Sequence, residues 1–98
     1  MYRHGDILIA PVTSIPEGAK PRMGTVLARG ELTGHSHRIE HAEEANLLDY
    51  RGEMFIEVTA PSTRLIHQEH HPITLPRGRY RFWFQREYTP QTIRRVID

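Results

Sequence analysis

Cysteine is absent from the 98 residues of this chain. Its absence excludes disulfide bridges, thiolate zinc sites, iron–sulfur clusters and a cysteine nucleophile. Long apolar runs are missing as well: the longest near the start, residues 7–10, is far too short for a signal-peptide core or a transmembrane helix. We therefore expect a soluble, cytoplasmic protein with no membrane partner.

An excess of charge of one sign is also lacking. Thirteen Lys and Arg residues stand against twelve Asp and Glu residues, which gives a net charge of +1. No global field therefore directs the chain to nucleic acid or to an acidic membrane. Phosphate-binding loops, dinucleotide fingerprints, H-E-x-x-H and G-x-S-x-G are missing too, so the sequence offers none of these ready-made catalytic signatures.

The length and composition allow one small globular domain. Hydrophobic residues make up 38% and charged residues 26%, which is polar but unlike the composition of disordered chains. A chain of 98 residues can bury only a modest core. We therefore assign residues 1–98 to a single domain.

Short apolar runs separated by dense turn signals predict an all-β fold. Seven Gly and seven Pro residues interrupt runs of four to eight residues that are rich in β-branched and aromatic side chains. The spacing favours a small single-domain barrel or sandwich of six to eight short strands. The expected strands cover residues 6–12, 25–28, 32–39, 47–50, 54–59, 63–69, 72–75 and 80–88.

The segments between these strands have their own signals. Residues 40–45 form the one convincing helical fragment of the first half, and Arg51-Gly52 predicts a hairpin turn. Residues 76–78, Pro-Arg-Gly, predict a second turn. The tail 91–98 fits either a short helix after Pro90 or a terminal strand.

Side chains along the longest predicted strand alternate between two faces. Tyr80, Phe82 and Phe84 point one way and form the expected core face. Arg79, Arg81 and Trp83 point the other way, and two interpretations of that face stay open. It is either a solvated outer surface or a platform on which arginines meet phosphates and the tryptophan stacks a base.

Seven histidines are the most unusual feature that is present. His35 and His37 form an H-x-H pair, and on a strand such residues share one face about 7 Å apart. Both imidazoles can then reach one ion at nitrogen–metal distances of about 2 Å. The pair therefore predicts half of a metal site.

A second histidine group follows in the sequence IHQEHHP. His67, His70 and His71 surround Glu69, and a strand that bends before Pro72 would let these side chains converge. We predict a site of three or four ligands drawn from His35, His37, His67, His70 and His71. The competing interpretation is a set of surface histidines, which is how we interpret His4 and His41.

Imidazole nitrogen suits several divalent transition metals. Zn²⁺ is favoured, and Mn, Fe and Ni remain open. Three ligands with an open position would indicate catalysis, whereas four closed ligands would indicate a structural ion.

The motif GHSH at 34–37 on a predicted strand resembles the H-x-H of the cupin family. Glu40 lies near the family's glutamate spacing, and Pro76-Arg-Gly78 is similar to its later turn; Arg81 occupies the place of its last histidine. The resemblance implies a β-barrel with a metal. The longer pattern TGHSHR, IHQEHHPITLP and QREYTP also resembles a family of small uncharacterised bacterial proteins, which implies no activity.

Three functional hypotheses follow from these residues. The leading one is a divalent-metal-binding protein that, if catalytic, hydrolyses a phosphate ester of RNA or a small molecule, with Glu69 as base and Arg79 and Arg81 as anion clamps. The second is a non-catalytic module that binds single-stranded nucleic acid or a protein through the Arg/Trp face. The third is a purely structural metal. The substrate and the oligomeric state stay open, and an oligomer is compatible with the sequence.

Overall fold

The computed structural model describes residues 1–30, 34–88 and 93–95. These residues form β-strands and one short 3-10 helix, η1, at Ala42–Glu44; they contain no α-helix. The strands are β1 (Tyr2–His4), β2 (Ile7–Pro11), β3 (Lys20–Arg22), β4 (Val26–Arg29), β5 (Ser36–Ile39), β6 (Ala45–Tyr50), β7 (Glu53–Ile66), β8 (Ile73–Phe84), β9 (Arg86–Tyr88) and β10 (Ile93–Arg95).

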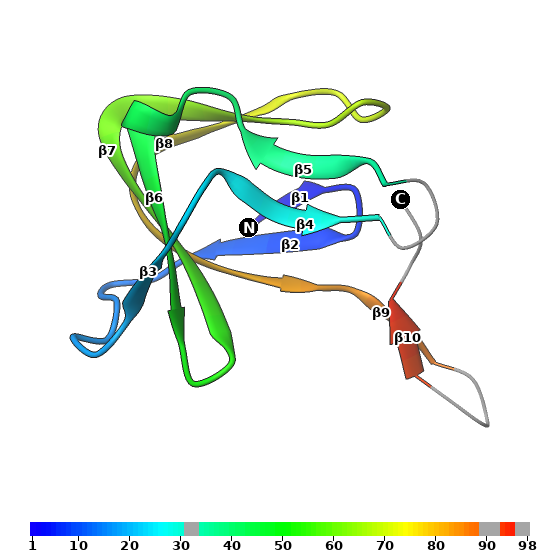
Figure 1. Cartoon of the computed structure of the whole chain (residues 1–98), viewed down its shortest axis with the longest axis horizontal. Coiled ribbons are helices and arrows are strands. Elements are labelled where there is room, and N and C mark those ends of the chain that lie inside the picture. The colour runs from blue at the N-terminus through cyan, green and yellow to red at the C-terminus, as the bar shows by residue number, and fades with distance from the viewer. Residues whose placement is uncertain (31–33, 89–92, 96–98) are drawn as a thin grey trace.

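Eight of these strands belong to one antiparallel sheet: six follow in the order β1-β2-β8-β7-β5-β4, and β6 and β3 lie off this path. The two longest strands, β7 and β8, pair with each other on both sides of a register shift between Val58 and Ser62. The first part of β7 also pairs with β6, which in turn pairs with β3, whereas the end of β7 pairs with β5. The strand β7 therefore connects two arms of one sheet (Figure 1): the first arm consists of β6 and β3, and the second arm consists of β5 and β4.

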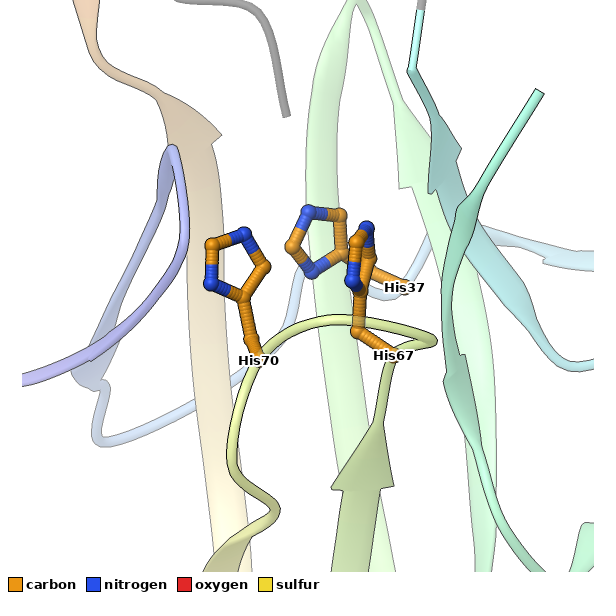
Figure 2. A group of neighbouring side chains, drawn as sticks. All are labelled: His37, His67 and His70. Carbon is orange, nitrogen blue, oxygen red and sulfur yellow. The ribbon is translucent and has the colours of Figure 1, made fainter. Parts of the chain in front are cut away.

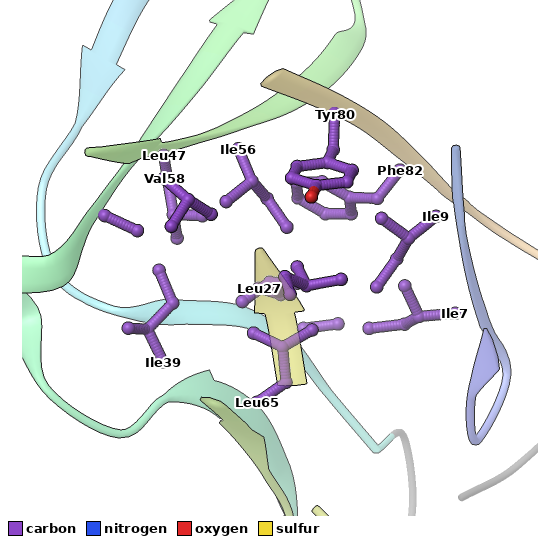
Figure 3. Close-up of a cluster of buried hydrophobic side chains, with 13 residues drawn as sticks. Ile7, Ile9, Leu27, Ile39, Leu47, Ile56, Val58, Leu65, Tyr80 and Phe82 are labelled. Atoms are coloured by element: carbon purple, nitrogen blue, oxygen red, sulfur yellow. The ribbon is translucent and has the colours of Figure 1, made fainter. Parts of the chain in front are cut away.

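The sheet encloses its core between these arms. Side chains from β2 and β8 pack in one cluster with side chains from β4, β5, β6 and β7 (Figure 3). The most deeply buried apolar members have at most 2% of their surface exposed, and they come from five strands: Ile7, Ile9, Ile39, Leu47, Ile56, Val58, Leu65, Leu75 and Phe82. Burial of such side chains stabilises a fold by about 1.5–3 kcal/mol each, so this cluster holds the two arms together.

The predicted all-β class is confirmed, but the sheet is not closed as a barrel. The predicted strand 54–59 and residues 63–66 of the predicted strand 63–69 belong to one strand, β7, which ends before residues 67–69. The predicted turn at 76–78 is wrong, because Pro76 and Gly78 lie inside β8 and pair with Ser62 and Val58. The irregular register there accommodates a proline and a glycine that would otherwise end a strand.

Several local predictions agree with the structure. The hairpin turn at Arg51-Gly52 is confirmed: both residues have positive φ, at 47° and 82°, as a two-residue type I′ connection requires. Tyr80 and Phe82 are buried while Arg79 and Arg81 are exposed, so the predicted alternation holds. The helical fragment is reduced to η1, and residues 93–95 of the tail form a strand. The start of the predicted strand 32–39 lies partly outside the described residues.

No helix among the described residues is both long enough and apolar enough to span a bilayer.

Candidate metal centre

The β1–β2 hairpin places two polar side chains on either side of one glycine. His4 ends β1 and pairs with Ile7 across a two-residue turn, Gly5-Asp6. Gly5 adopts a φ of 62°, which a type II′ turn requires at its first central position. The backbone carbonyl of Asp6 accepts a hydrogen bond from the Gln85 amide at 2.8 Å, so the turn is tied to the end of β8. His4 and Asp6 are therefore held on a short, anchored hairpin.

His37 comes from the second arm of the sheet. It lies on β5, where only 1% of its surface is exposed. Two hydrogen bonds fix its neighbours: the Gly30 amide donates to the His35 carbonyl at 2.7 Å, and the Ser36 amide donates to Gln68 Oε1 at 3.0 Å. The second bond ties β5 to the connection between β7 and β8, which carries the other histidines.

Three histidines converge at this place. His67 directly follows β7, and His70 lies in the same connection between β7 and β8. One ring nitrogen from each of His37, His67 and His70 lies within 4.8 Å of the others. Figure 2 shows the three rings gathered in one group, with His67 and His70 on a single loop. A group of this size is within reach of one ion.

The ring positions describe how tightly the group is packed. The centroid of the His67 ring lies 4.4 Å from that of His37 and 4.5 Å from that of His70. The His37 and His70 rings are nearly parallel, with centroids 5.7 Å apart. Two nitrogens that bind one tetrahedral zinc at about 2.1 Å lie about 3.4 Å apart, so no nitrogen pair in this group has to close by more than about 1.4 Å to bind one ion.

His4 lies against the same group, and its expected place on the surface is wrong. Only 2% of its surface is exposed. Its Nδ1 is 3.0 Å from Nδ1 of His37, and its ring centroid is 6.4 Å from that of His67 and 6.1 Å from that of His70. His41, by contrast, is exposed as predicted.

The buried carboxylate of Asp6 determines which nitrogen of His37 carries a proton. Asp6 Oδ1 lies 3.4 Å from His37 Nε2, and both side chains are at least 96% buried. An ionised carboxylate only accepts hydrogen bonds, so we assign the proton of neutral His37 to Nε2. The lone pair of Nδ1 then faces the His4 ring. A carboxylate behind one nitrogen and a lone pair on the other is the arrangement that metal-binding histidines use.

The surroundings of His4 favour its uncharged form. The pKa of His4 falls from 6.5 to about 4, first because burial disfavours the charged ring and then because His37, His70 and His67 repel its proton. A backbone group of His71 acts in the opposite direction. A neutral imidazole is the form that binds a metal, so near pH 7 His4 is already in that form.

His67 accepts a hydrogen bond that would change if a metal ion bound to its ring. Its Nδ1 accepts from the Glu69 amide at 3.0 Å, so the proton of the neutral ring lies on Nε2. Binding through Nδ1 would replace this hydrogen bond, and binding through Nε2 would move the proton to Nδ1 and open it. In either case the loop at 67–70 must adjust when an ion binds.

The remaining predicted ligands and the predicted base lie at the edge of the group or outside it. The His35 ring centroid is 5.5 Å from that of His67, and its Nδ1 is 3.7 Å from Glu69 Oε1. The side chains of His35 and Glu69 are 27% and 63% exposed, so they form the solvent-accessible edge of the histidine group. His71 is exposed and is not among the three clustered ligands.

The two predicted anion clamps lie on the outward face of β8. Arg79 and Arg81 are exposed, on the side of the strand opposite to the buried Tyr80 and Phe82. Arg79 is 3.7 Å from Glu57, and Arg81 is 3.1 Å from Glu53. Both guanidinium groups therefore face carboxylates. The structure does not bring these arginines into the histidine group.

Sequence reasoning missed His4 and Asp6. They are 33 and 31 positions before His37, and no strand spacing links them to the H-x-H pair. One local signal was present: the Gly5-Asp6 dipeptide ahead of an apolar strand is a hairpin signal. A hairpin there would have placed His4 opposite Ile7, a core residue.

Comparisons with known proteins agree with part of the sequence analysis. No curated protein and no solved structure matches the chain. No family match supports the resemblance to cupins. A family model described as a domain of unknown function matches residues 3–85, which include the whole histidine group. The chain therefore belongs to this family, the domain of unknown function DUF8820.

Proposed function

We propose that this protein binds one divalent transition-metal ion through His37, His67 and His70. The observation that carries the proposal is the convergence of three ligand nitrogens within 4.8 Å, from β5 and from the β7–β8 connection. Chance clustering of surface histidines does not account for a buried His37 with a buried carboxylate behind it. Metal-binding histidines are oriented by such carboxylates.

The donor set favours zinc, iron or nickel over manganese. All three clustered ligands are imidazoles, which suit Zn, Cu, Fe and Ni, whereas Mn prefers oxygen. Asp6 adds one buried negative charge next to His37, and this charge partly balances a divalent cation. A Zn²⁺ ion with neutral histidines fits this donor set, and Zn²⁺ is the ion with which we would test it.

Phosphate-ester hydrolysis and nucleic-acid binding receive less support. A hydrolytic centre would need anion-binding groups near the ion, but Arg79 and Arg81 face Glu57 and Glu53 instead. The guanidinium of Arg81 also lies over the Trp83 ring, 5.4 Å from its centre. It therefore covers the ring surface on which a nucleic-acid base would stack. The proposal therefore stops at metal binding.

Metal affinity measured by competition with a chromophoric chelator tests the proposal. We expect the wild-type protein to bind one Zn²⁺ per chain and His67→Ala and His70→Ala to lose more than about tenfold in affinity. His41→Ala is the matched control, because His41 is exposed and outside the group. Equal affinities for the wild type and both loop variants would contradict the proposal.

A further inference from the structure

His4 directly contacts one of the three proposed ligands, His37. Its Nδ1 is 3.0 Å from Nδ1 of His37, and both rings are at least 98% buried. Two nitrogens at this separation share either one proton or one cation, because two facing lone pairs repel. A proton is sufficient in the ion-free arrangement. When an ion binds His37 through Nδ1, it takes the place of that proton.

We infer that His4 is the fourth ligand of the ion, so that the centre is a closed site of four histidines: His4, His37, His67 and His70. This inference rests on the proposed function. Two nitrogens on one tetrahedral zinc lie about 3.4 Å apart, so the pair His4 and His37 is already within about 0.4 Å of the required separation. When the ion binds His4 through Nδ1, the proton of His4 moves from Nδ1 to Nε2. The ring stays neutral.

The two loop histidines supply the movement that this geometry needs. The ring centroids of His67 and His70 are 6.4 Å and 6.1 Å from that of His4. Rings bound to one zinc come within about 5 Å of each other. The hairpin that carries His4 is anchored to β8 through the Asp6 carbonyl, whereas His67 and His70 lie outside strands. The loop therefore closes onto His4 and His37.

His35 is the competing candidate for the fourth position. Its ring is nearer to His67 than His4 is, with centroids 5.5 Å apart. However, the His35 side chain is 27% exposed and faces Glu69, and Glu69 is itself 63% exposed. If His35 were the ligand, the buried His4 nitrogen would lie beside an ion-bound His37 without binding the ion. The burial and the 3.0 Å contact select His4.

A closed site assigns the ion a structural role. Four protein ligands leave no position for a bound water, so the ion ties β1, β5 and the β7–β8 connection together and does not activate a substrate. The strand β1 is at one end of the strand order, and β5 is next to the other end. Small domains often use such an ion in place of a larger core.

The number of histidines on the ion tests this inference without any substitution. We would load the wild-type protein with Zn²⁺ and record nitrogen-15 NMR spectra of its histidine side chains, together with zinc X-ray absorption. We expect four metal-bound imidazoles, including Nδ1 of His4. Three bound imidazoles, or four that include His35 in place of His4, would overturn the inference while leaving the proposed function intact. No bound zinc would overturn both.

A substitution separates the role of His4 as a ligand from its role as a hydrogen-bond partner. Asparagine at position 4 keeps an amide near the place of Nδ1 and can still donate to His37, but it is a poor zinc ligand. We expect His4→Asn to lose more than about tenfold in zinc affinity, and His35→Ala to stay within about threefold of the wild type. Circular dichroism establishes that each variant is folded. Wild-type affinity in a folded His4→Asn protein would contradict the inference.

Discussion

Acid should destabilise the ion-free protein through His4 more than through an ordinary histidine. The pKa of His4 is 6.5 when the ring is solvated and about 4 in the folded protein, mainly because of burial. Between these two values the unfolded chain binds a proton that the folded chain refuses. Stability from this residue is therefore present above pH 6.5 and is lost as the pH falls towards 4.

The size of the loss follows from the same two values. A fall from 6.5 to about 4 corresponds to about 3 kcal/mol at 1.36 kcal/mol for each pH unit. The loop histidines next to His4 are only half-buried, and solvent near them screens part of this cost. We therefore expect His4 to account for about 1–3 kcal/mol between pH 7.5 and pH 4.

Urea unfolding in the presence of a chelator measures this contribution. The free energy of unfolding would be determined at several pH values for the wild type and for His4→Asn, which keeps a hydrogen-bonding group but does not titrate. We expect the wild type to lose about 1–3 kcal/mol more than the variant over this range. Equal losses in the two proteins would refute the reasoning, because the buried neutral ring would then contribute nothing to the pH dependence.

Three further predictions concern the ion and the fold. Zinc at about 100 times its Kd should raise the Tm by about 10–20 °C, and a chelator should reverse this rise; scanning calorimetry with and without the chelator measures both. Leu65→Ala should lower the free energy of unfolding by about 2–5 kcal/mol, because the side chain is fully buried between the arms; a loss below about 1 kcal/mol in urea unfolding would show that the cluster is loosely packed. Arg22→Ala should cost about 1–2 kcal/mol, because Arg22 pairs with both oxygens of Asp49 and donates to the Leu27 carbonyl; Lys20→Ala, at an exposed position on the same strand, is its control in the same assay.

The fold class could be predicted because strand signals are local. Alternation at Arg79 to Phe82 and the turn at Arg51-Gly52 depend on neighbouring residues, and both are found in the structure. The continuity of β8 through Pro76 and Gly78 could not be predicted. It depends on pairing with Ser62 and Val58, residues that are distant in the sequence, and on a register shift that relieves the local conflict.

The candidate site was predictable to the extent that its ligands are close in the sequence. His67 and His70 lie three residues apart, and their grouping with His37 was within reach of the spacing argument. His4 was not, because a lone histidine before a short strand resembles a surface residue. The antiparallel pairing of β2 with β8, and of β8 with β7, determines that the first hairpin reaches β5. Long-range pairing of this kind leaves no local trace.

Metal content per chain tests the central claim most directly. The wild type and His37→Ala would be purified without added metal, incubated with Zn²⁺, passed through a desalting column and analysed by elemental mass spectrometry. We predict close to one zinc per wild-type chain and a large loss in His37→Ala, because that residue offers a lone pair to the ion and is oriented by Asp6. No retained zinc in the wild type, or equal zinc in both proteins, would contradict a metal centre at these histidines.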